Sequence, residues 1–102
     1  MVFSDTEFPS LRLWTVQRQV RLGAESDIVV QQERPLDTVV HVEFTGPDGN
    51  VRPWYAINLR LTGGTGSTVF TPALSDPAGA WTVRATDVVS GRQATSTIEL
   101  MP

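Results

Sequence analysis

Apolar and polar residues alternate along most of this chain with a period of two, the pattern of strands that bury one face. No window shows the i, i+3, i+4 spacing of an amphipathic helix, and turn-forming residues recur at intervals of roughly 8–12 residues, as in β-sandwiches. The alternation predicts about seven strands, within residues 14–22, 27–33, 38–45, 54–61, 68–71, 81–86 and 94–100. The sequence therefore predicts an all-β domain.

Two of these segments carry a tryptophan on their apolar face. Trp81 shares its parity with Val83 and Ala85, and Trp14 shares its parity with Val16, so we expect both tryptophans in the core. The complete pattern predicts a two-sheet antiparallel sandwich over residues 11–102, preceded by an irregular lead-in or linker at 1–10. Its expected core consists of Val40, Val42, Phe44, Ile57, Leu59, Phe70, Trp81, Val83 and Ile98.

Glycine, proline and aspartate mark the predicted turns. Gly46–Asn50 contains Pro47, which presets its own φ, and Asp48-Gly49, which supplies a residue able to adopt positive φ. Similar signals at 76–79 and 87–91 predict two further turns, and Gly63–Gly66 predicts a flexible loop.

Size and charge exclude several classes of protein. With 102 residues the chain is long enough for one core and too short for two. The net charge is −3, there is no lysine, and the eight arginines are scattered, which argues against nucleic acid as a partner. The absence of cysteine excludes disulfides and thiolate metal sites, but leaves the compartment open.

No apolar run approaches the ~20 residues of a membrane-spanning helix, so we expect no membrane association. The first residues, Met1 to Asp5, lack the basic and apolar stretches of a signal peptide. We therefore expect either a protein that stays inside the cell or a piece of a longer chain.

The segment Asp76–Val83 resembles the end of an immunoglobulin-like domain. In that family an aromatic residue, usually the corner tyrosine, stands two positions before a buried cysteine. Here Trp81 stands at the tyrosine position and Val83 at the cysteine position. This departure from the family pattern excludes the disulfide and replaces the tyrosine hydroxyl by an indole N–H, which is able to bond back to the preceding turn.

A second resemblance runs from Val42 to Leu100. The pieces that carry it are Gly46–Gly49, Trp54–Leu59, Ala73–Val83 and Asp87–Gly91. They are similar to accessory β-sandwich modules of large bacterial secreted proteins, including glycoside hydrolases of the β-galactosidase type, and the same outline occurs in macroglobulin-like and fibronectin-like modules. This resemblance implies a non-catalytic domain without cofactors, whose partners are other domains of its own parent chain or another protein, and it favours a secreted, periplasmic or cell-surface location.

Residues able to form a hydrolase site are present but poorly placed. His41, the single histidine, lies within a strand, whereas Asp87 and Ser90 belong to a predicted hairpin turn. No Gly-x-Ser-x-Gly motif occurs, and a triad needs a matched nucleophile, base and orienting group. We therefore predict that the chain is not an enzyme by itself.

Carboxylates present two further possibilities. A glycosidase needs two of them roughly 5–9 Å apart across a cleft, and Glu33, Glu43 and Glu99 fall in separate segments. Turn aspartates are potential calcium ligands, but none has the dense spacing of a calcium loop, so shaping of local turns is the favoured role. These aspartates are Asp48, Asp76 and Asp87.

Trp54 is the strongest candidate for a binding residue. The apolar face of its segment is formed by Tyr55, Ile57 and Leu59, which places Trp54 on the other side with Asn58 and Arg60. An exposed tryptophan there can dock against a neighbouring domain or stack on a sugar. We thus expect a structural or interaction module that docks through Trp54, Asn58 and Arg60. The alternatives are a carbohydrate-binding module that uses Trp54 and Tyr55, and a free-standing adaptor inside the cell.

Overall fold

The computed structural model describes residues 11–34 and 36–102, so the predicted lead-in at 1–10 lies outside the described residues. The described residues form eight strands and one short 3-10 helix. The elements are β1 (Leu11–Thr15), β2 (Gln19–Arg21), β3 (Ser26–Gln32), β4 (Thr38–Thr45), η2 (Pro53–Tyr55), β5 (Ile57–Leu61), β6 (Thr65–Phe70), β7 (Gly79–Asp87) and β8 (Gln93–Met101). Within the described residues no helix is long and apolar enough to span a membrane.

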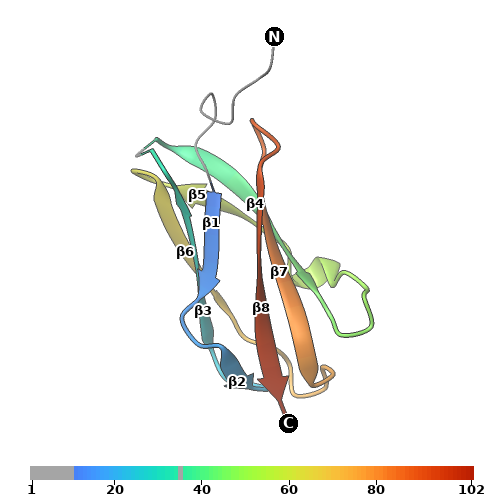
Figure 1. The fold of residues 1–102 in the computed structure, drawn as a ribbon. Helices are drawn as coiled ribbons and strands as arrows, with labels where there is room; N and C mark the ends of the chain where they lie inside the picture. The colour runs from blue at the N-terminus through green and yellow to red at the C-terminus, as the bar shows by residue number, and fades with distance from the viewer. Residues whose placement is uncertain (1–10, 35) are drawn as a thin grey trace.

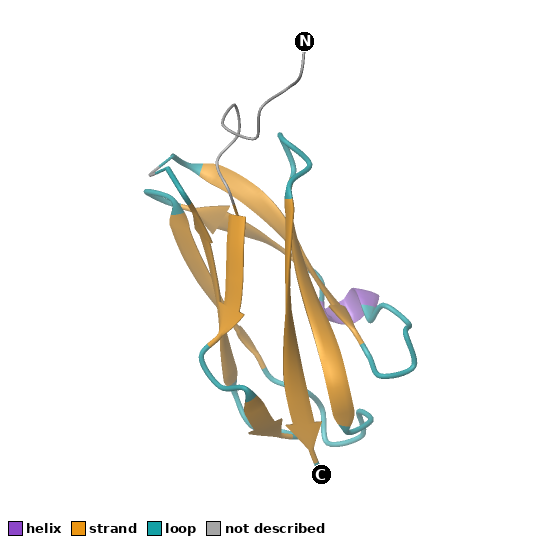
Figure 2. Cartoon of the chain, viewed as in Figure 1, coloured by secondary structure: helices purple, strands orange, loops and turns teal. Residues whose placement is uncertain are grey.

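The strands form two sheets that face each other (Figure 1). One has three strands in the order β1-β3-β6, and the other has five in the order β2-β8-β7-β4-β5. All neighbours are antiparallel except β2 and β8, which run parallel. The predicted two-sheet sandwich is confirmed, and almost all of the described residues outside the strands lie in loops (Figure 2).

The longest strands, β7 and β8, set the register of the larger sheet. Trp81 lies opposite Ile98, and Phe44 on β4 lies opposite Val83. Because side chains alternate in direction along a strand, these pairs all face the smaller sheet. Seven of the nine predicted core residues are fully or almost fully buried, while Ile57 and Leu59 are partly buried and pack against the core.

The prediction for Trp14 is wrong, because β1 turns its other face inward. Leu13 and Thr15 are buried, whereas 40% of Trp14 and 58% of Val16 are exposed. Both parities of this segment carry large apolar residues, so alternation alone does not fix the direction of the strand. The chain then leaves the smaller sheet after Thr15 and enters the larger one at Gln19, which divides the predicted strand at 14–22 in two.

Two further boundaries differ from the prediction. Thr65 and Gly66 belong to β6 rather than to a flexible loop. A Cβ on Gly66 would come within 2.6 Å of the Arg60 carbonyl oxygen, so β5 and β6 need glycine to approach this closely. Trp54 lies in η2 and not in a strand, because Pro53 begins a helical turn before β5 starts at Ile57.

Trp81 is buried whereas Trp14 is partly exposed, and this difference gives a direct test of the fold. Trp81→Ala removes a fully buried indole and should lower the free energy of unfolding by about 3–5 kcal/mol. Trp14→Ala is the matched control, and should cost less than about 1 kcal/mol because this side chain is on the surface. Urea unfolding followed by circular dichroism measures both, and equal losses would contradict the assignment of β1.

Candidate interaction surface around Trp54

A cluster of four aromatic rings fills one end of the core. The stacked rings of Phe44 and Phe70 have centroids 4.4 Å apart, and Tyr55 meets Phe70 edge-on at 4.9 Å. Trp81 lies 5.9 Å from Phe70 and 6.2 Å from Tyr55. Aromatic pairs at these distances and angles add about 0.5–1.5 kcal/mol each beyond the burial of their area. The cluster therefore holds η2, β4, β6 and β7 together.

The indole of Trp81 is satisfied on its polar side as well. Its Nε1–H donates to the carbonyl oxygen of Pro77 at 2.9 Å, four residues back along the chain. The indole thus forms the bond to the preceding turn that the sequence left open. Arg52 lies over the same ring, with its Cζ 5.4 Å from the ring centroid, at a distance typical of a cation–π contact.

Arg52 is buried, and acceptors of the β4–β5 loop surround its guanidinium. Its two terminal nitrogens each donate to a different carboxylate oxygen of Asp48 at 3.1 Å, and Nη1 also donates to the carbonyl oxygen of Asn50 at 2.7 Å. A Cβ on Gly46 would lie 2.7 Å from Nη2, so the guanidinium fits only against a glycine here. This two-pronged pair fixes the loop between β4 and η2.

Asp48 is strongly biased towards its charged form. Its hydrogen bonds with Arg52, together with the backbone N–H of Asn50, lower the pKa of Asp48 to about 2 from an ordinary value of 3.8. The carboxylate is open to solvent on its other side, so this shift reports the ion pair and its hydrogen bonds rather than burial.

Tyr55 joins η2 to the loop between β6 and β7. Its hydroxyl donates to the carboxylate of Asp76 and accepts the backbone N–H of Ala73 at 3.0 Å. The same Ala73 N–H also reaches Asp76 at 2.8 Å. Burial, and then the bond to Asp76, raise the pKa of the Tyr55 hydroxyl above its usual 10.0.

These bonds present two apolar side chains to solvent from two fixed loops. Trp54 precedes Tyr55 and is 69% exposed, and Leu74 follows Ala73 and is 80% exposed. The ring of Trp54 lies beside that of Tyr55, with centroids 6.2 Å apart and the two planes tilted by 51°. We call the surface formed by the exposed Trp54 and the half-buried Tyr55 beside it the tryptophan corner. Leu74 lies apart from it, beside Gly23.

Asn58 and Arg60 are exposed as predicted, but they lie on the outer face of β5 and their neighbours differ from those of Trp54. Asn58 Oδ1 lies 3.0 Å from His41 Nδ1 on β4, and His41 Nε2 lies 3.2 Å from a carboxylate oxygen of Glu43. Arg60 pairs with Val39 one step further along β5. The structure thus divides the predicted surface into the tryptophan corner and a polar row on the larger sheet.

The residues considered for a hydrolase triad are not brought together. His41 points outward from β4, whereas Asp87 is buried in the neighbouring strand. Asp87 accepts the backbone N–H groups of Val89 and Ser90 and the hydroxyl of Thr38, so it shapes the β7–β8 hairpin. The hydroxyl of Ser90 accepts the backbone N–H of Arg92 within the same turn.

The turn aspartates considered for calcium also have protein partners. Asp48 binds Arg52 and Asn50, Asp76 binds Tyr55 and Ala73, and Asp87 holds its hairpin. Across residues 11–34 and 36–102 no three histidine, cysteine or acidic side chains gather closely enough to hold a metal ion. The favoured prediction, that each aspartate shapes its own turn, agrees with these contacts.

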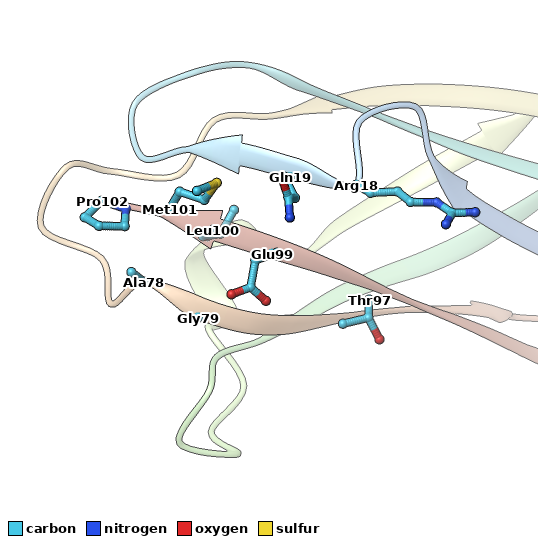
Figure 3. Close-up of a pocket in the computed structure, with 9 residues that line it drawn as sticks. All are labelled: Arg18, Gln19, Ala78, Gly79, Thr97, Glu99, Leu100, Met101 and Pro102. Atoms are coloured by element: carbon cyan, nitrogen blue, oxygen red, sulfur yellow. The ribbon is translucent and has the colours of Figure 1, made fainter.

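A shallow hollow of about 650 Å³ lies where β2, β8 and the start of β7 meet. Figure 3 shows Glu99 directed into it, while the side chain of Arg18 extends away from it, beyond the start of β2. Gln19, Leu100 and Met101 also contribute to the lining. With a single carboxylate and no facing acid or base among the labelled side chains, the hollow offers no paired groups for acid–base chemistry.

Several residues of η2 and of the loops beside it were not singled out in the sequence. Arg52 and the hydroxyl of Tyr55 both form hydrogen bonds with loop residues, which alternation along the strands does not predict. Only the i, i+4 spacing of Asp48 and Arg52 hints at the ion pair between these two residues. Leu74 is a lone apolar residue among turn-forming neighbours, which is a weak signal because single exposed apolar residues are common.

Comparison with solved structures places this fold among modules of larger proteins. Residues of the chain superpose on part of E. coli alpha-2-macroglobulin in its native conformation with a TM-score of 0.79 and 12% identity, covering 97% of this chain and 6% of that protein. The CARDB domain of the PF1109 protein of Pyrococcus furiosus, solved in complex with di-metal ions, matches with a TM-score of 0.56 and 15% identity over 99% of this chain and 100% of that domain.

At these identities the likeness shows the fold alone: the chain has an immunoglobulin-like β-sandwich fold, as predicted. No family model and no curated protein matches the chain. The chain spans only a small part of the E. coli protein, so the similarity lies with one domain of a large multi-domain protein.

The Asp48–Arg52 pair predicts a specific response to acid. Because the folded pKa of about 2 lies below the ordinary 3.8, the ionised carboxylate stabilises the fold above pH 3.8, and this contribution is lost as the pH falls towards 2. Asp48→Asn should therefore destabilise the domain at neutral pH, and its difference from the wild type should shrink over that range.

Urea unfolding at a series of pH values measures this difference. Asp27→Asn, at an exposed position on β3, controls for the loss of one negative charge. A difference between wild type and Asp48→Asn that stays constant between pH 3.8 and pH 2 would contradict the ion pair.

Proposed function

We propose that this chain is a non-catalytic interaction module that packs on, or spaces, other domains of a larger secreted bacterial protein. The observation that carries the proposal is the tryptophan corner, where an exposed indole stands on a loop that is fixed from both sides. The likeness to one domain of E. coli alpha-2-macroglobulin supports a place within a multi-domain chain.

The physical argument rests on preorganisation. Association costs the entropy of every side chain and loop that it orders, so a docking residue on a rigid support loses less on binding. Tyr55 anchors η2 to the β6–β7 loop, and Arg52 anchors the β4–β5 loop to Trp81. Trp54 lies between these two anchors, and tryptophan is among the residues that contribute most at interfaces.

The non-catalytic part of the proposal rests on where the reactive side chains lie. His41 and Asp87 occupy opposite faces of the larger sheet, and the turn aspartates are engaged with arginine, tyrosine or backbone donors. The partner that we infer is a neighbouring domain of the parent chain, which meets Trp54 with an apolar surface. The glycoside hydrolase setting suggested by the turn motifs stays a prediction, since neither similar structure described above is a glycosidase.

Site-specific crosslinking tests the docking role. With a photoreactive phenylalanine at position 54 in the longest natural chain that contains this domain, irradiation should give crosslinks to residues outside 1–102, because Trp54 is buried against the partner. The same amino acid at Thr95, an exposed position on the outer face of β8, is the matched control and should give few or none. Crosslinks that are absent at 54, or no more frequent there than at 95, would overturn the proposal.

Carbohydrate binding is the second candidate, favoured by the exposure of Trp54. At the tryptophan corner, Trp54 is the one well-exposed ring among the described residues, because Tyr55 is packed in the aromatic cluster and its hydroxyl is occupied by Asp76 and Ala73. Sugar stacking on Trp54 would change the tryptophan fluorescence during titration with oligosaccharides, and Trp54→Phe would remove that change.

We expect no change in emission across a broad panel of oligosaccharides, because a single exposed ring lacks the polar groups that hold a sugar in place. A saturable shift that Trp54→Phe abolishes would replace docking by carbohydrate binding as the role of the tryptophan corner.

A further inference from the structure

The four edge strands of the two sheets are β1, β6, β2 and β5, and they differ in whether they carry a charged residue. Unpaired edge strands are sites of unwanted strand pairing, and proteins usually protect them with charged residues, proline or a bulge. Three of the margins carry an arginine, namely Arg12 on β1, Arg21 on β2 and Arg60 on β5. The fourth, β6, has the sequence TGSTVF, with no charged residue and no proline.

The free edge of β6 offers main-chain hydrogen-bonding groups. Gln32 N–H donates to the carbonyl oxygen of Gly64, so even-numbered residues of this strand direct their N–H and C=O groups towards β3. Odd-numbered residues direct theirs away from β3. Thr65 uses both of its groups on Thr62, whereas the structure gives no partner, within the residues it describes, for the main-chain groups of Ser67 and Val69.

The surroundings of this edge leave room for another strand. Ser67 and Val69 have exposed side chains, with Val69 53% accessible, while Thr68 and Phe70 point inward. Figure 1 shows β6 at the outer margin of the smaller sheet, and β5 passes behind it near its first residues, where Gly66 approaches Arg60. The second half of β6 is therefore an uncharged strand edge with two exposed side chains.

We propose that β6 pairs with β6 of a second copy of this chain in antiparallel orientation, which joins two smaller sheets into one six-stranded sheet. Centring the pair on Thr68 places Ser67 opposite Val69 of the second copy, and Val69 opposite its Ser67. Each free N–H then meets a C=O, because antiparallel pairing of a strand with itself matches donors to acceptors by symmetry.

A second copy fits this edge better than a charged partner segment. No side chain on β6 is available to form an ion pair, so recognition rests on the main chain and on small or β-branched side chains. Since Val29 and Trp14 lie in the same row as Ser67 on the outer face, the pairing also joins this exposed apolar row to Val69 of the second copy. The proposal concerns a surface separate from the tryptophan corner and does not depend on it.

Sedimentation equilibrium of the 102-residue chain, from micromolar to millimolar concentration, tests the pairing. We expect a monomer–dimer equilibrium that changes little with salt, because no charge takes part. Ser67→Lys should raise the dissociation constant of the dimer by about tenfold or more, because like charges on the two copies become diagonal neighbours across the new strand pair. Ser67→Glu should act in the same direction.

Mixing the two variants separates edge pairing from other effects. The Ser67→Lys and Ser67→Glu chains should form a heterodimer at least as readily as the wild type dimerises, because opposite charges then lie side by side. Gln31→Lys, on the outer face of the central strand β3, is the matched control and should leave dimerisation unchanged.

Amide hydrogen exchange measures the proposed pairing directly at Ser67 and Val69. The amides of Ser67 and Val69 should become more protected as concentration rises, whereas exposed loop amides should not. A protein that stays monomeric to millimolar concentration, a dimer that is indifferent to Ser67→Lys, or concentration-independent exchange at Ser67 and Val69 would each overturn the proposal.

Discussion

The burial of the Trp81 indole is the constraint on which most of this structure depends. Its ring packs against Phe70 and Tyr55, and its N–H would cost free energy in the core without an acceptor. The carbonyl of Pro77 supplies that acceptor, which requires the β6–β7 loop to turn back over the start of β7. The path of this loop, and with it the position of Ala73 and Asp76 beside Tyr55, follows from the satisfaction of one buried donor.

The face of Trp81 imposes a second requirement. Arg52 lies over the ring in a buried position, and a guanidinium removed from water is tolerated only where acceptors surround it. Asp48 and the carbonyl of Asn50 provide those acceptors, which explains why the Gly46–Asn50 turn closes against Arg52 rather than extending into solvent. Both loops beside the tryptophan corner are thus held by contacts that begin at Trp81.

The sequence allowed the fold class and most of the core to be predicted, because β4, β7 and β8 are long strands in which one parity is apolar and the other polar. Prediction failed where this contrast disappears. At β1, Leu11 and Leu13 share one parity while Trp14 and Val16 share the other, so alternation alone does not show that the face of Leu13 is the buried one. Trp54 was correctly expected to be exposed, but its neighbours could not be predicted, because η2 is positioned by contacts of Tyr55 with a loop some twenty residues away.

The account as a whole requires that Trp81 is locked within the core while Trp54 stands free on a rigid support. Exchange of the three indole N–H protons with deuterated solvent, followed by NMR, measures this most directly. We predict that the Trp81 indole exchanges only when the whole domain unfolds, whereas the indoles of Trp14 and Trp54 exchange much faster. Rapid exchange at Trp81, or protection of Trp54 equal to that of Trp81, would contradict the account.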